Sequence, residues 1–213
     1  MRKPLQRHPE KPASETKRRK VVVCICGMAG SGKSTVAERL AEKYGLRLYS
    51  GGDALKSLAS EMGYEVHQRG WWESQDGIKF LKQRIENPEI DKKVDMRLMG
   101  WAEQGNVILD SWTMPWLLKE GFKVWLEASE EVRADRVSKR DGISLKEALG
   151  YLREKESSTK AIYKKLYGFD LGKDFTPFHL VLDVNLLNEG EVFQVLRMVI
   201  ENLLLRKKAK EFS

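Results

Sequence analysis

The chain has 213 residues, a formal net charge of +7 and only two cysteines, a size that suits one α/β domain and a composition that excludes a disulfide-rich framework. No apolar run reaches the roughly 18 residues that span a bilayer, and the N-terminus is too polar for a signal peptide. We therefore expect a cytoplasmic monomer that makes no membrane contact.

Most of the net charge lies at the N-terminus. Residues 1–20 hold eight Lys or Arg and two Glu with almost no apolar side chain, whereas the rest of the chain is nearly neutral. This composition predicts a disordered basic tail. We interpret the tail as a solubilising extension, and the alternative is an arm that contacts nucleic acid or a membrane surface. Residues 21–213 are predicted to form a single domain.

A phosphate-binding loop is the clearest motif. An apolar, β-branched segment at 21–26 predicts a buried parallel strand, and apolar positions at helical spacing predict a helix over 36–45. Between them the sequence fits the pattern G-x-x-x-x-G-K-[ST]. We expect the nucleotide donor to bind along this loop, at Gly27, Met28, Ala29, Gly30, Ser31, Gly32, Lys33, Ser34 and Thr35.

Each residue type in the loop has a chemical role. Glycines let successive backbone N–H groups turn towards phosphate oxygens, and the following helix presents its positive end to the same anion. Lys33 would act catalytically at the β- and γ-phosphates, and the Ser34 hydroxyl would bind Mg²⁺. Cys24 and Cys26 lie on the preceding strand without nearby histidines, so we expect core thiols rather than a metal site.

The rest of the chain alternates strands and helices. Strands are expected at 46–50, 106–110, 122–126 and 179–183. Helices are expected over 54–62 with Asp53 as N-cap, over 72–85 and 90–104, after Ser129, from the capping box at Ser144 towards Tyr167, and over 191–205. This order predicts an α/β fold of the P-loop NTPase type, with a five-stranded parallel sheet, helices on both faces and a helical insertion.

Two groups at strand ends are candidates for chemistry, because ligands gather at the carboxyl ends of parallel strands. Asp110 ends the third strand and would bind Mg²⁺ beside Ser34; the alternative is an acid that caps a turn. Asp53 and Lys56 follow the second strand and are candidates for recognising an acceptor; the alternative is a cap and a solvated lysine.

A basic helix follows the fourth strand and ends at a glycine. Its cations are predicted to form a lid, in which Arg136 and Arg140 would neutralise the charge that spreads over a migrating phosphoryl group. The alternative is an ordinary surface helix with mixed charges. The cations concerned are Arg133, Arg136, Lys139 and Arg140.

Several segments besides the phosphate loop are more specific than a generic nucleotide-binding motif. They are YSGGD (49–53), NPEIDKKVD (87–95), GNVILD (105–110), VRADRVSKRDGIS (132–144) and YKKLYGFD (163–170). With these segments the chain resembles, over about residues 21–205, the archaeal-type cytidylate kinases, which are P-loop nucleoside monophosphate kinases. The resemblance implies transfer of phosphate from ATP to CMP or dCMP with Mg²⁺, a monophosphate-binding region at 53–104 that includes Asp95, and a lid region at 133–165.

The chain departs from the family pattern near the expected acceptor. Lys56 stands where an arginine is usual, residues 111–116 (SWTMPW) stand where a Gly-Arg pair is expected, and Ile162 replaces a basic residue. Lysine cannot reproduce the bidentate arginine–phosphate contact. The missing arginines could be replaced by Arg69, Arg84 or Arg97, and Arg97 is taken as a substrate-binding candidate. Stacking on a base or packing in the core are alternative roles for Trp71, Trp72 and Trp112.

Two other functions remain open from the sequence. One is a P-loop kinase of the same fold with another small acceptor, motivated by the altered segment at 111–116. The other is a nucleotide- or RNA-binding protein with little turnover that uses the basic tail. The sequence has no Asn-Lys-x-Asp motif for guanine, which argues against a GTPase switch.

Overall fold

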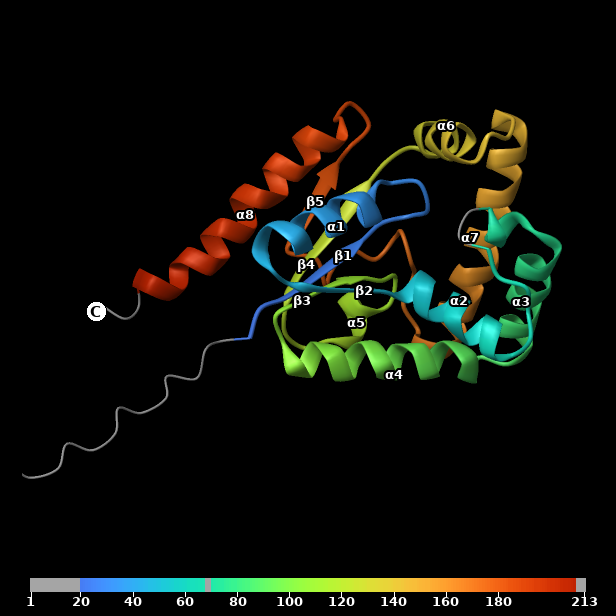
Figure 1. Cartoon of the computed structure of the whole chain (residues 1–213), viewed down its shortest axis with the longest axis horizontal. Helices are drawn as coiled ribbons and strands as arrows, with labels where there is room; N and C mark the ends of the chain where they lie inside the picture. Colours follow the sequence, from blue (N-terminus) through green and yellow to red (C-terminus); the bar gives the residue numbers. More distant parts are fainter. Residues whose placement is uncertain (1–19, 68–69, 210–213) are drawn as a thin grey trace, which may run out of the picture.

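Five parallel strands form the centre of the structure, a computed structural model that describes residues 20–67 and 70–209 (Figure 1). Every neighbouring pair of strands is parallel, so all carboxyl ends lie at one edge, and the predicted fold is confirmed. Residues 1–19 of the predicted tail lie outside the described residues. In spatial order the strands are β2 (Arg47–Ser50), β3 (Val107–Asp110), β1 (Val22–Cys26), β4 (Phe122–Glu127) and β5 (Leu180–Asp183).

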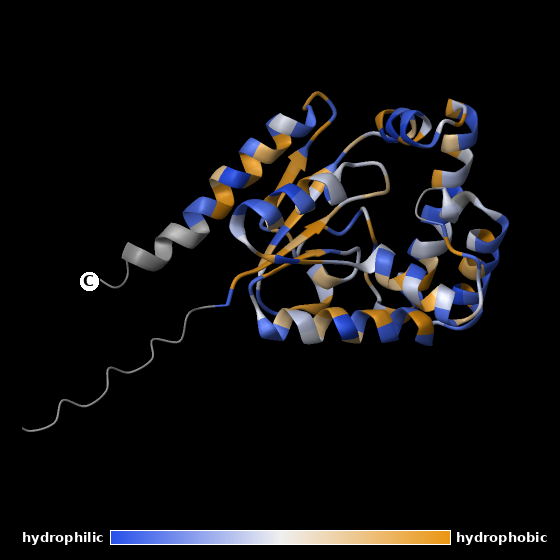
Figure 2. Cartoon of the chain, in the orientation of Figure 1, coloured by the Kyte–Doolittle hydropathy of each residue, from blue (hydrophilic) through white to orange (hydrophobic). Residues whose placement is uncertain are grey.

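Helices cover both faces of this sheet. α1 (Lys33–Tyr44) and α8 (Glu189–Ala209) pack on one face, against the inward side chains of β1, β3 and β4. α4 (Glu89–Gln104) and α5 (Met114–Leu117) cover the other face. Figure 2 shows the strands as mostly hydrophobic, as expected for a sheet buried on both sides.

The remaining helices lie beyond the carboxyl ends of the strands (Figure 1). They are α2 (Gly51–Glu61), the 3₁₀ turn η1 (Trp71–Glu73), α3 (Gln75–Glu86), α6 (Glu130–Asp141) and α7 (Leu145–Tyr167). α6 packs on α7, and α7 packs on α3, so this end of the molecule is built from helices distant in sequence. The Ser129 cap and the Ser144 capping box are both present as predicted.

The predicted start of α2 is wrong. Asp53 is not the N-cap: the Ser50 hydroxyl accepts the hydrogen bond of the Asp53 backbone N–H at 3.2 Å, and the helix begins at Gly51. Two glycines indicated a turn, but a serine at the strand end caps the helix directly. Asp53 then lies in the first turn, where its charge is favourable to the helix N-terminus.

The helix expected over 72–85 is divided by a second serine cap. Ser74 ends η1 and begins α3, and its hydroxyl accepts the hydrogen bond of the Gly77 N–H at 3.1 Å. A Cβ atom on Gly77 would lie within 3.0 Å of the backbone of Trp71 and Trp72. The turn folds back against α3 at this glycine, which holds both tryptophans against the helix.

Cys24 and Cys26 are fully buried free thiols on the same side of β1, as expected. Burial raises the pKa of Cys24 to about 12 and raises that of Cys26 well above its usual value, so both thiols stay protonated. Over the described ranges, 20–67 and 70–209, none of the helices combines the length and the hydrophobicity required to traverse a bilayer.

Candidate active site

The glycines of the phosphate loop determine its conformation. Gly27, Gly30 and Gly32 have φ angles of 151°, 81° and 90°, which residues with a Cβ rarely adopt. A Cβ atom on Gly27 would lie 2.5 Å from the Leu126 carbonyl oxygen, and one on Gly30 would lie 2.7 Å from the Arg133 carbonyl oxygen. Glycine is therefore favoured by the backbone angle at all three positions, and at Gly27 and Gly30 also by the close approach of β4 and α6.

α1 begins at Lys33, directly after this loop. Gly32 is its N-cap residue and offers no side chain to the first N–H groups of the helix, which leaves them available to an anion. The Lys33 ammonium lies 5.7 Å from the centre of the Trp112 ring, inside the same cavity. The loop, the helix end and Lys33 together form a positively polarised surface that suits a polyphosphate.

The structure brings the two predicted Mg²⁺ ligands together. The Ser34 hydroxyl donates a hydrogen bond of 2.5 Å to a carboxylate oxygen of Asp110. This contact arises because β1 and β3 are neighbours, with Ile25 paired with Asp110. Mg²⁺ binds through one or two protein oxygens together with phosphate oxygens, and this hydroxyl–carboxylate pair at the start of α1 fits that donor set.

A cavity of about 760 Å³ extends from the loop into the helical region. Near the loop it is bounded by α6 and by the first turn of α8. Its far end is lined by α2, α3, α4 and α7, and carries the side chains of Trp72, Arg84, Asp91, Asp95 and Tyr163. One continuous space thus has a polyphosphate-binding end and a second, more enclosed end.

A buried ion pair lies at the far end of the cavity. Arg84 donates to both carboxylate oxygens of Asp91, from Nε at 3.1 Å and from Nη2 at 2.6 Å. Both side chains are 2% exposed, and the guanidinium carbon lies 5.9 Å from the centre of the Trp72 ring. The bidentate contact satisfies two buried charges and fixes the orientation of the guanidinium.

Asp95 lies beside this pair and is also buried. Thr113 donates to one of its carboxylate oxygens at 2.5 Å, and the Tyr167 hydroxyl donates to the other at 2.6 Å. Burial raises the pKa of Asp95 to about 6, against the opposing effect of these two hydrogen bonds. The carboxylate connects α4, the segment after β3 and the end of α7.

The raised pKa of Asp95 predicts a pH dependence of stability. Between pH 4 and 6 the folded chain binds more protons at this site than the unfolded chain, so the free energy of unfolding falls as pH rises through that range. Relative to Asp95→Asn, the wild type should lose about 2 kcal/mol between pH 4 and pH 7. Urea unfolding at both pH values measures this difference.

The matched control for that experiment is Asp135→Asn, which removes an exposed carboxylate of α6 paired with Lys139. Its stability difference from the wild type should stay small over the same pH range, because an exposed ion pair contributes little to stability. If the free energy of unfolding of the wild type and of Asp95→Asn changed in parallel from pH 4 to pH 7, the raised pKa of Asp95 would be contradicted.

The cations predicted to form a lid have defined partners. Arg136 lines the cavity and donates to the backbone carbonyls of Val184 at 2.8 Å and Ser31 at 3.4 Å. Arg140 also lines the cavity and pairs with Asp141 at 2.6 Å. These contacts hold the Arg136 guanidinium close to the phosphate loop, whereas the Arg140 guanidinium lies at the exposed edge of the cavity.

The candidates for acceptor binding are placed unequally. Asp53 and Lys56 line the cavity and lie 3.9 Å apart as an ion pair. Asp95 and Arg84 line its far end, whereas Arg69 lies outside the described residues. Arg97 is not brought to the cavity: it lies half exposed on α4, 3.9 Å from Glu61.

One cavity cation was missed in the sequence. Lys155 lies with its ammonium 4.4 Å from the centre of the Trp72 ring and 5.9 Å from that of Trp112. It is one helical turn beyond Tyr151 on α7, and both residues line the cavity. The spacing of four along an expected helix was the available signal, but it does not reveal which side of the helix faces the site.

Sequence comparison identifies relatives over most of the chain. A model of the cytidylate kinase-like family matches residues 22–186. A cytidylate kinase of Methanopyrus kandleri is 36% identical over 88% of this chain and 96% of its own length. One of Methanocaldococcus jannaschii is 36% identical over 86% of this chain and 99% of its own length.

Solved structures support the fold independently. A Thermus thermophilus protein, TT1252, superposes with a TM-score of 0.52 and 23% identity, covering 86% of this chain and 98% of its own. Shikimate kinase from Acinetobacter baumannii superposes with a TM-score of 0.51 and 16% identity, covering 89% and 96%. At these identities the likeness concerns the fold alone. The family match and the relatives show that the chain belongs to the cytidylate kinase-like family.

Proposed function

We propose that this protein transfers the γ-phosphate of ATP to a nucleoside monophosphate, with CMP or dCMP as the acceptor. The single observation that carries the proposal is the continuous cavity, which joins a phosphate loop with its Ser34–Asp110 pair to an enclosed, polar second end. The names of the relatives point to cytidine nucleotides. The free thiols of Cys24 and Cys26 fit a reducing, cytoplasmic environment.

The proposed donor site is the phosphate loop, from Gly27 to Thr35. Its backbone N–H groups and Lys33 would bind the β- and γ-phosphates. Ser34 and Asp110 would hold Mg²⁺, which when bound neutralises charge on those phosphates. Arg136 and Arg140 would add positive charge from the proposed lid region at 133–165.

The proposed acceptor site is the far end of the cavity, within the monophosphate-binding region at 53–104. Lys56 and Asp53 lie on its α2 side, and Asp95 lies at its base. Lys155 adds a cation from α7 between two indole rings. We leave Arg97 out of this site because its side chain lies on the outer surface, paired with Glu61.

The proposed reaction needs no covalent intermediate. An oxygen of the acceptor phosphate attacks the γ-phosphorus in line, while the bond from that phosphorus to the bridging oxygen of ADP breaks. Because an acceptor phosphate is already ionised, no general base is required. The protein contributes by positioning the two nucleotides in one cavity and by neutralising the charge of the migrating group.

A coupled assay of ADP release over a panel of acceptors tests this proposal. With ATP and Mg²⁺, we expect turnover with CMP and dCMP to exceed that with UMP, AMP and GMP by at least about tenfold, a margin of about 1.4 kcal/mol in transition-state binding. Strong turnover of a non-nucleotide acceptor such as shikimate, with none of CMP, would favour the other kinase class. ATP binding without turnover of any acceptor would reject the enzyme altogether.

A further inference from the structure

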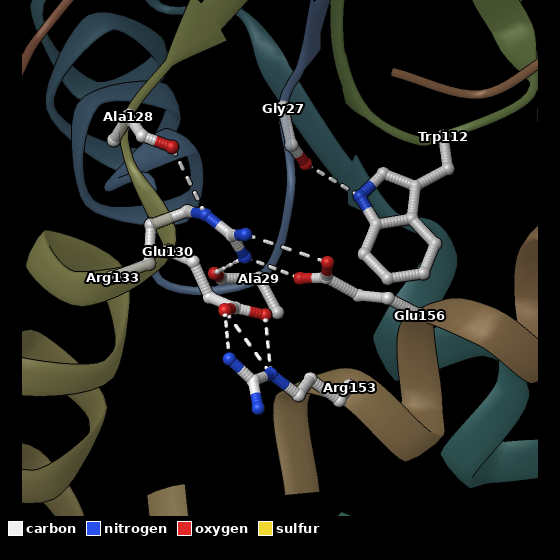
Figure 3. A network of polar contacts seen from close by, with 8 residues as sticks. All are labelled: Gly27, Ala29, Trp112, Ala128, Glu130, Arg133, Arg153 and Glu156. Carbon is white, nitrogen blue, oxygen red and sulfur yellow. Dashed lines mark hydrogen bonds and ion pairs between the residues drawn. The ribbon is translucent and has the colours of Figure 1, made fainter. Parts of the chain in front are cut away.

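The backbone carbonyls of the phosphate loop accept hydrogen bonds from side chains of other elements. The indole N–H of Trp112 donates to the Gly27 carbonyl at 2.5 Å, and Nη1 of Arg133 donates to the Ala29 carbonyl at 3.1 Å (Figure 3). Arg136 makes a longer contact, 3.4 Å, with the Ser31 carbonyl. The three carbonyls alternate along the loop, and their donors come from two separate parts of the chain.

Peptide geometry converts these contacts into an orientation of the opposite groups. In a planar trans peptide the C=O and the following N–H point in opposite directions. A donor that holds the Ala29 carbonyl outward therefore turns the Gly30 N–H inward, and a donor at Ser31 does the same for Gly32. Gly30 and Gly32 both line the cavity and have positive φ angles that allow this alternation. The donor at Gly27 fixes the peptide group shared with Met28, and neither of these residues is among those that line the cavity, so this contact anchors the start of the loop.

The two stronger donors are themselves fixed. Arg133 is buried, donates from Nε to the Ala128 carbonyl at 3.1 Å, and forms an ion pair with Glu156 of α7 (Figure 3). Trp112 follows β3 within the segment that departs from the family pattern, and its ring also lies 5.7 Å from the Lys33 ammonium. One indole thus contacts the first peptide group of the loop and the cation of the loop at the same time.

We propose that Trp112 and Arg133 are positioning residues: Trp112 anchors the start of the phosphate loop at Gly27, and Arg133 orients the peptide group between Ala29 and Gly30. Together they determine the affinity for the triphosphate donor. In this role neither side chain needs to touch the transferred phosphate. Preformed N–H groups spare the loop a reorganisation when the anion binds. The proposal rests on the assignment of the loop to nucleotide binding and is independent of the identity of the acceptor.

The test is to remove one indole hydrogen bond and measure nucleotide binding. Trp112→Phe keeps a ring near Lys33 but removes the N–H that holds Gly27. We expect the dissociation constant of a non-hydrolysable ATP analogue to rise about tenfold by calorimetry, as for the loss of one hydrogen bond. The dissociation constant for CMP should rise less than that for the analogue, because phenylalanine keeps a ring beside Lys155 but has no N–H for the Gly27 carbonyl.

Trp116→Phe is the matched control. Its indole N–H donates to Asp174 at 2.8 Å, so the variant also removes a partly buried indole hydrogen bond, four residues away and outside the phosphate loop. We expect it to lower the melting temperature about as much as Trp112→Phe and to leave the affinity for the ATP analogue unchanged. A purely structural role for Trp112 predicts equal binding constants in the two variants.

If Trp112→Phe does not fold, Arg133→Lys provides a second test, at the Ala29 carbonyl. Lysine keeps a charge near Glu156 but cannot reach Ala29, Ala128 and that carboxylate together. We expect the same weakening for the ATP analogue with CMP binding unchanged. Wild-type affinity for the analogue in either folded variant, or an equal loss in Trp116→Phe, would overturn the proposal. Wild-type protein that binds ATP without phosphorylating CMP would reject the proposed function alone.

Discussion

Lys33→Ala is expected to lower kcat for phosphoryl transfer by at least about a thousandfold, equivalent to about 4 kcal/mol of transition-state stabilisation. Lys33 is the first residue of α1, and its ammonium shares the cavity with the backbone of the phosphate loop. It is the loop's only cationic side chain. In a site that works by positioning and charge, its removal eliminates a large part of the electrostatic stabilisation.

The same variant should fold normally. Lys33 is partly exposed, and its contact with the Trp112 ring at 5.7 Å contributes about 1 kcal/mol at most. Lys43→Ala removes another lysine of α1, near Tyr44 at the far end of the helix, and should retain wild-type kcat. Steady-state kinetics and thermal melts of both variants measure these outcomes. Substantial turnover in Lys33→Ala would argue strongly against the assigned donor site.

Arg84→Leu is expected to destabilise the fold by about 3–5 kcal/mol, because it leaves the Asp91 carboxylate charged and unpaired in the interior. In the wild type both partners are 2% exposed and share two hydrogen bonds. For a domain of this size the loss corresponds to a fall of roughly 10 °C or more in melting temperature. Replacing both partners, as Arg84→Leu with Asp91→Leu, should recover much of the loss because no unpaired buried charge remains.

Arg97→Leu is the matched control for this prediction. Its partner Glu61 lies 3.9 Å away, and both side chains are about half exposed. Pairs of this kind contribute about 0–1 kcal/mol because water already solvates both charges. Measured by chemical denaturation, the loss in free energy of unfolding should therefore be several-fold larger for Arg84→Leu than for Arg97→Leu. A loss below about 1 kcal/mol in Arg84→Leu would mean that water reaches Asp91, in contradiction to the observed burial.

The sequence determined the central part of the fold. Each strand was recognisable as a short apolar run, and the phosphate loop as a local motif between a strand and a helix. The serine caps at Ser129 and Ser144 were also predictable, because a cap is formed by residues three positions apart. Asp53 shows the limit of such patterns: Ser50 stood three residues before it, and Gly51 and Gly52 were interpreted as a turn.

The tertiary structure decided which polar residues belong to the site. Arg84 and Arg97 are both candidates in the sequence, and Arg97 is the one taken as substrate-binding. In the structure Arg84 is a buried partner of Asp91, whereas Arg97 is an exposed neighbour of Glu61. Trp112 binds a carbonyl 85 positions earlier in the chain, and Arg133 binds one 104 positions earlier. Local patterns describe how a segment folds on itself. Contacts across such separations depend on how the sheet orders its strands and on how the helices pack against it, and no single segment encodes that arrangement.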